Sequence, residues 1–123
     1  MPILFYVDDS RDDLFYLDYI RKKQQVDVDL FCFSTAQDAF EALEERLEAG
    51  EGVPDILIAD LYMPLDSGSG LIARLRRDDR CSAMQLGICS GSDAVEDRER
   101  ALAAGADFYL EKPLDLVGIV SNL

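Results

Sequence analysis

The segments Ile3-Leu4-Phe5-Tyr6-Val7-Asp8-Asp9 and Ile56-Leu57-Ile58-Ala59-Asp60 share one pattern, a short unbroken apolar run that ends in aspartate. Apolar runs of this length without alternation are typical of strands that are buried on both faces, as in a parallel sheet. In an open parallel sheet, ligands bind outside the carboxyl ends of the strands. The two segments therefore predict both the sheet and the edge of it where a functional site should lie.

Working outward, further apolar stretches alternate with helical patterns along the rest of the chain. We expect strands also at 26–32, 86–89 and 108–110, and helices at 10–23, 35–49, around 71–75, at 93–104 and at 114–123. Strands that alternate with helices imply right-handed crossovers and helices on both faces. The sequence therefore predicts an α/β fold, a single (βα)5 flavodoxin-like, doubly wound parallel sheet with strand order 2-1-3-4-5, built by one domain over residues 1–123.

The composition narrows the functional classes. The formal net charge is −13, so the chain lacks the basic surface that nucleic-acid binding requires, and no apolar run is long enough to span a membrane. Three widely spaced cysteines favour reduced thiols and a cytoplasmic location over a disulfide framework. The absence of histidine excludes histidine-based metal sites and every histidine-dependent triad.

Polar residues follow the predicted strands where each strand ends. Asp8 and Asp9 follow the first strand, Asp60 the third, Ser90 the fourth and Lys112 the fifth. Three neighbouring carboxylates repel one another unless a positive charge lies among them, and one lysine leaves a residual charge that suits a divalent cation. Oxygen-only ligands favour Mg²⁺. An aspartate in such a site can act as a nucleophile toward phosphorus, and Asp60, at the end of the middle strand, is the best candidate.

Taken in order, these motifs resemble the receiver domain of bacterial response regulators. The resemblance covers nearly the whole chain and depends on four elements: Val7-Asp8-Asp9, Asp60-Leu61-Tyr62-Met63-Pro64, Ser90 and Lys112-Pro113. It implies a signalling domain of two-component phosphorelays. Such a domain is not an enzyme acting on other substrates, because it catalyses only its own phosphorylation and dephosphorylation. Asp60 would receive a phosphoryl group from a phosphohistidine on a sensor histidine kinase or a histidine phosphotransfer protein.

The resemblance also assigns roles to individual residues. Mg²⁺ would be bound by Asp8, Asp9, Asp60 and the backbone carbonyl of Tyr62. Ser90 and Lys112 would contact the phosphoryl group, with Ser90 and Tyr109 acting as the switch pair, and the Lys112-Pro113 bond would be cis. The signal would pass to a downstream protein or output domain. A homodimer of the receiver domain is a further possibility that the resemblance implies.

Some features depart from the family pattern or have a second interpretation. The glycine that normally follows the proline of the central motif is either Gly68 or Gly70, and the last helix is short. On the first helix, Phe15, Tyr16 and Tyr19 could dock the phosphodonor, or two of the three could pack on the sheet or under the second helix. We expect Tyr16 to pack in this way, and both interpretations stay open for Phe15. We expect Asp12 and Asp13 to serve only the helix dipole, and Ser92 and Asp93 to cap the fourth helix.

Three other functions fit the sequence less well. A phosphatase with an aspartate nucleophile commonly needs a second acid two residues further on, where this chain has Tyr62. A flavin carrier needs a hydroxyl- and glycine-rich loop after the first strand, where this chain has Asp8-Asp9. A binding module that is never phosphorylated remains a fourth interpretation, although every expected site residue is present.

Overall fold

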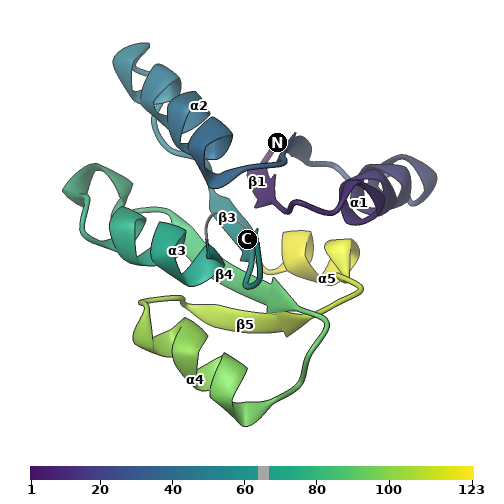
Figure 1. Cartoon of the computed structure of the whole chain (residues 1–123). Coiled ribbons are helices and arrows are strands. Elements are labelled where there is room, and N and C mark those ends of the chain that lie inside the picture. The colour runs from purple at the N-terminus through teal and green to yellow at the C-terminus, as the bar shows by residue number, and fades with distance from the viewer. Residues whose placement is uncertain (64–66) are drawn as a thin grey trace.

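The computed structural model describes residues 1–63 and 67–123 and consists of five strands and five helices in strict alternation (Figure 1). The strands are β1 (Ile3–Val7), β2 (Asp29–Phe33), β3 (Ile56–Asp60), β4 (Gln85–Ser90) and β5 (Phe108–Glu111). The helices are α1 (Arg11–Lys23), α2 (Ala36–Glu48), α3 (Gly68–Arg76), α4 (Val95–Ala103) and α5 (Leu116–Ser121), with a 3₁₀ turn at Asp79–Cys81. Pro64, part of the central motif, lies outside the described residues.

All five strands belong to one parallel sheet in the order β2-β1-β3-β4-β5, which confirms the predicted topology. The central strands β1 and β3 are neighbours, with Leu4 opposite Ile56 and Val7 opposite Ala59. Their carboxyl ends therefore lie side by side, and the two segments that predicted the fold end at one place on the sheet edge.

The sheet separates two hydrophobic cores because successive side chains of a strand point to opposite faces. Phe5 and Val7 pack with residues of α2, α3 and α4, whereas Leu4 and Tyr6 pack with residues of α1 and α5. Figure 1 shows α1 and α5 on one side of the sheet and the other three helices on the opposite side. The helices therefore cover both faces, as a doubly wound fold requires.

Side-chain caps fix where two of the helices begin. The Ser10 hydroxyl accepts a hydrogen bond from the backbone N–H of Asp13, and the Thr35 hydroxyl accepts one from that of Asp38. Both caps follow from the sequence pattern of a hydroxyl residue with an acid three positions later. The Ser10 cap starts α1 immediately after the Asp8-Asp9 pair.

The structure corrects four boundaries. The second strand starts at Asp29 and not at residue 26, because its partner β1 starts opposite it at Ile3. Helix α3 already begins at Gly68, where the Ser67 hydroxyl accepts from the backbone N–H of Gly70. Helix α5 covers only Leu116–Ser121.

The fourth corrected boundary concerns α4, where the predicted caps Ser92 and Asp93 are wrong. The residue before the helix is Ala94, which makes no side-chain capping bond. The Ser92 hydroxyl instead accepts from the backbone N–H of Ala94, 3.0 Å away, and so closes a turn ahead of the helix.

The expectation that Tyr16 of α1 packs against the protein is also wrong. Phe15, Tyr16 and Tyr19 remain 75%, 40% and 46% exposed, so none of the three is buried against the sheet. The core contact of this helix is made by Leu17, which is buried, and by Leu14 and Ile20 at its margin. None of the helices in the two described ranges is long and apolar enough to cross a membrane.

Candidate functional site

The site lies at the carboxyl ends of the strands, where the sequence predicted it. Asp8 and Asp9 follow β1, and Asp60 is the last residue of the neighbouring strand β3. Each of these residues has a carboxylate oxygen within 4.8 Å of those of the other two. Asp8 and Asp60 are buried, whereas Asp9 is exposed. The structure therefore brings the three predicted acids together although 52 positions separate the first from the last.

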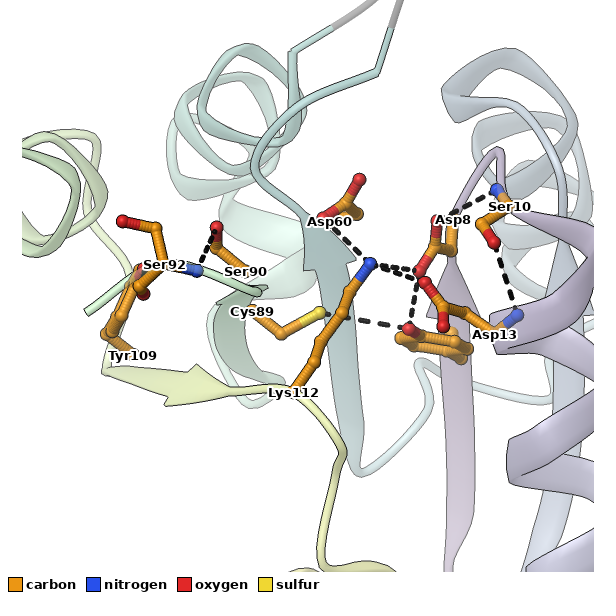
Figure 2. A network of polar contacts seen from close by, with 10 residues as sticks. Asp8, Ser10, Asp13, Asp60, Cys89, Ser90, Ser92, Tyr109 and Lys112 are labelled. Atoms are coloured by element: carbon orange, nitrogen blue, oxygen red, sulfur yellow. Dashed lines mark hydrogen bonds and ion pairs between the residues drawn. The ribbon is translucent and has the colours of Figure 1, made fainter. Parts of the chain in front are cut away.

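Lys112 lies among these acids (Figure 2). Its ammonium nitrogen is 2.8 Å from Asp8 Oδ2 and 3.2 Å from Asp60 Oδ1. It is also 2.7 Å from Asp13 Oδ2, so Asp13 does more than complement the dipole of α1, and the expectation for that residue is corrected. The first turn of α1 passes beside the strand ends and carries Asp13 into the cluster, a contact that helical periodicity alone does not reveal.

Charge in this cluster is far from balanced. With Asp13 included, four carboxylates face one ammonium group, which gives a formal charge of −3. Burial raises the pKa of Asp60 to about 6; the negative charge of Asp8 adds to this effect, and the Lys112 ammonium opposes it. Burial alone would lower the pKa of Lys112, but its hydrogen bonds to Asp13 and Asp8 outweigh that effect and raise the pKa. The cluster therefore favours any additional positive charge.

Asp8 is fixed by three hydrogen-bond donors. The backbone N–H of Ser10 donates to Oδ1 at 2.9 Å, while Lys112 and the Tyr6 hydroxyl, at 2.6 Å, approach Oδ2. Burial raises the pKa of Tyr6, and the nearby Cys89 and Asp8 raise it further, so its phenol is a neutral donor. The sequence analysis missed Tyr6. A phenol two positions before Asp8, and so on the same face of the strand, was the available signal.

Ser90 and Tyr109 lie further along the same edge and meet at the loop after β4 (Figure 2). Both side chains are buried. The Ser90 hydroxyl accepts from the backbone N–H of Ser92 at 3.1 Å, and the Tyr109 hydroxyl donates to the carbonyl oxygen of Ser92. Among the described residues, neither side chain bonds directly to the acidic cluster. They are instead connected to each other through one loop residue.

Tyr62 lies two positions after Asp60, and its ring is 54% exposed. The Tyr62 hydroxyl donates to Asp97 of α4, and the Arg100 guanidinium lies 5.9 Å from the ring centre. This hydrogen bond lowers the pKa of Asp97. The loop that follows Asp60 is thus tied to α4 through the Tyr62 side chain, a contact that the sequence pattern does not predict.

Gly68 resolves the choice between the two candidate glycines. A Cβ atom at this position would overlap the backbone carbonyl of Asp60, whereas at Gly70 it would meet only the Ser67 hydroxyl, 3.0 Å away. The start of α3 can therefore pack against the end of β3 only if residue 68 has no side chain. The Lys112–Pro113 bond, which follows the lysine of the cluster, is cis as predicted.

The donor set suits a hard divalent cation. The cluster offers carboxylate oxygens and no soft ligand, because the fully buried Cys89 points to the core side of β4, where its sulfur is 3.9 Å from the Tyr6 hydroxyl. Mg²⁺ accepts one or two carboxylates and keeps waters that a phosphate oxygen can replace. The arrangement thus places a buried carboxylate next to two further acids and a fixed lysine.

Comparison with known proteins agrees with this fold. The family model for the response regulator receiver domain matches residues 4–123. The transcriptional regulatory protein PrrA of Mycobacterium tuberculosis is 33% identical over 122 residues, which is 99% of this chain and 48% of that protein. The transcriptional regulatory protein PhoP of Escherichia coli is 31% identical over 86 residues, 70% of this chain and 38% of that protein. The chain thus spans about half the length of these relatives, or less.

Solved structures show the same fold. Response regulator RPA3017 of R. palustris superimposes with a TM-score of 0.80 at 22% identity, covering 99% of this chain and 88% of that one. The chemotaxis protein CheY4 of Vibrio cholerae gives 0.75 at 20% identity, covering 99% and 95%. The receiver domain of Ssk1 from Saccharomyces cerevisiae, solved with the histidine phosphotransfer signaling protein Ypd1, gives a TM-score of 0.74 at 18% identity, covering 98% and 85%.

Proposed function

The chain belongs to the response regulator receiver domain family of two-component systems, and on this premise we propose that Asp60 is its phosphoryl acceptor. The observation that carries the proposal is the placement of Asp60, buried at the end of the central strand, with its carboxylate 3.2 Å from the Lys112 ammonium and among two further acids. Phosphoryl transfer needs mainly alignment and charge neutralisation, and these groups supply both.

In the proposed reaction, a carboxylate oxygen of Asp60 bonds to the phosphorus of a phosphohistidine. The bond from phosphorus to the imidazole nitrogen breaks, and the donor histidine leaves as imidazole after taking up a proton from water. The donor would be a sensor histidine kinase or a histidine phosphotransfer protein. The pairing of a similar receiver with Ypd1 in a solved complex supports a partner of this class.

Asp8, Asp9, Asp60 and the backbone carbonyl of Tyr62 would hold Mg²⁺. When bound, the ion supplies positive charge that offsets the repulsion between the acids and the incoming phosphoryl oxygens. The Lys112 ammonium already forms an ion pair with Asp60 and would bind one oxygen of the phosphoryl group. Asp9, exposed at the mouth of the cluster, is the acid that solvent and ligands reach first.

The phosphoryl group would also act as a switch. It adds further negative charge and three strong acceptor oxygens, which would draw the Ser90 hydroxyl away from the backbone N–H of Ser92. Because the Tyr109 hydroxyl binds the carbonyl of the same residue, displacement of this loop changes the surroundings of both side chains. The altered surface would be recognised by a downstream protein or output domain, or by a second copy of the chain in a homodimer. We expect this signalling to take place in the cytoplasm.

The test is intact-mass measurement after incubation with acetyl phosphate, with Mg²⁺ or with EDTA. The wild-type chain should gain one phosphoryl group only with Mg²⁺, and Asp60→Asn should gain none. Asp27→Asn is the matched control, since Asp27 is an exposed acid in the segment before β2, and this variant should be labelled like the wild type. Full labelling of Asp60→Asn would refute the assignment.

A further inference from the structure

Tyr6 places a phenol beneath the acidic cluster. It belongs to β1, is 2% exposed, and lies two positions before Asp8, so both side chains point to the same face of the sheet. Its ring packs in the core formed with α1 and α5, next to Leu17, Ile58 and Cys89. Only its hydroxyl reaches the site, where it donates to Asp8 Oδ2 at 2.6 Å.

This hydrogen bond determines how Asp8 is presented. A carboxylate has about four acceptor positions. Tyr6 and Lys112 both donate to Oδ2, and the backbone N–H of Ser10 donates to Oδ1. The acceptor position left for a further ligand is therefore on Oδ1, on the side of the carboxylate away from the core. Asp8 is fully buried, so three groups of the protein itself set its orientation.

We propose that Tyr6 is a positioning residue of the cation site, which holds Asp8 with one oxygen directed to the ion. The inference rests on the proposed Mg²⁺ site and extends it to a residue in the core. Groups that hydrogen-bond to a metal ligand typically change metal affinity by about 10- to 100-fold when they are removed. We therefore expect Tyr6→Phe to weaken Mg²⁺ binding by roughly tenfold, at the lower end of that range.

Weaker binding is expected rather than tighter binding because of Lys112. Without the phenol, Asp8 Oδ2 keeps a single partner, the Lys112 ammonium at 2.8 Å. The carboxylate is then free to rotate toward that charge, and its other oxygen moves out of line with Asp9 and Asp60. A role confined to core packing predicts no such change, because phenylalanine keeps the ring that fills the core.

The experiment is calorimetric titration of the full chain with Mg²⁺ for the wild type, Tyr6→Phe and the control Tyr19→Phe. Tyr19 is an exposed tyrosine of α1, so its hydroxyl should not affect the dissociation constant. A Kd raised about tenfold in Tyr6→Phe alone supports the inference. An unchanged or lowered Kd in Tyr6→Phe, with normal binding by the wild type, overturns the inference and leaves the proposed function intact. If the wild type binds no Mg²⁺, the proposed cation site fails, and this inference fails with it.

A second measurement needs no substitution in the core. In the wild-type chain labelled with ¹³C at the tyrosine Cζ, Mg²⁺ should shift the Tyr6 signal more than the signals of Tyr16 and Tyr19, which lie on α1 and outside the proposed cation site. A purely structural role of Tyr6 would leave its signal in place. An unshifted Tyr6 signal at saturating Mg²⁺ contradicts the proposal even if Tyr6→Phe does not fold.

Discussion

Replacing Asp60 by asparagine should stabilise the protein at neutral pH in the absence of divalent cations. Burial and the charge of Asp8 raise the pKa of Asp60 from 3.8 to about 6, against the attraction of Lys112. A carboxyl group with a raised pKa favours folding while it is protonated and opposes folding once it is ionised. Its unfavourable contribution is therefore absent at low pH and appears as the pH rises from about 3.8 to about 6.

The size of the effect follows from that interval. Each pKa unit corresponds to about 1.4 kcal/mol, so ionised Asp60 should lower the free energy of unfolding by about 3 kcal/mol at pH 7.5. The attraction between Asp60 and Lys112 is already included in this free energy, because the pKa of about 6 is the net result of burial, the charge of Asp8 and the charge of Lys112. Asp60→Asn should thus gain about 3 kcal/mol at pH 7.5 and about half as much at pH 5.

Urea unfolding in EDTA at the two pH values measures this gain. Asp27→Asn removes the same charge from an exposed position and should change the free energy of unfolding by less than about 0.5 kcal/mol. Adding Mg²⁺ should stabilise the wild type more than Asp60→Asn, because only a ligand that binds the folded state better raises its stability. A destabilised Asp60→Asn at pH 7.5, or a gain that does not depend on pH, would refute the electrostatic reasoning.

Three further changes should separate the roles of neighbouring residues. Gly68→Ala should lower the free energy of unfolding in urea by about 2 kcal/mol through overlap with the β3 backbone, and Gly70→Ala, two residues further along the chain, should not; equal effects would contradict the close-packing argument. Lys112→Met should lower the free energy of unfolding in urea with EDTA by about 3 kcal/mol, because it leaves buried carboxylates without their partner. Mg²⁺ should restore part of this loss, and an unchanged unfolding midpoint would argue against the ion pairs. Tyr62→Phe should accelerate amide hydrogen exchange in the first turn of α4 several-fold by removing the bond to Asp97, and unchanged protection there would show that this bond does not hold the helix.

The sequence predicted the sheet because four of its strands are short apolar runs bounded by a charged or hydroxyl residue at the carboxyl end, and the second strand shows alternating apolar and polar residues. Asp8, Asp9 and Asp60 could be placed together from topology alone, since neighbouring parallel strands end at the same edge. Alternation along β4 places the side chains of Cys89 and Ser90 on opposite faces of the sheet, and Cys89 is fully buried.

Other parts of the site depend on distances that periodicity does not contain. Asp13 reaches Lys112 because the first turn of α1 folds over the strand ends, and the acid itself looked like an ordinary dipole partner. Tyr6 looked like one more apolar strand residue, although its hydroxyl binds Asp8. The boundary of α4 moved to Ala94 because Ser92 uses its hydroxyl to close the preceding turn. In each case a polar contact outweighed the local pattern.

The identity of the phosphorylated residue is the central claim, and chemical mapping tests it most directly. Borohydride reduces an aspartyl phosphate to homoserine, so the wild-type chain, phosphorylated in the presence of Mg²⁺, reduced and digested, should carry the reduced residue at position 60 alone. Reduction at position 8 or 9, or a phosphate that resists borohydride and maps to Ser90, would contradict the account.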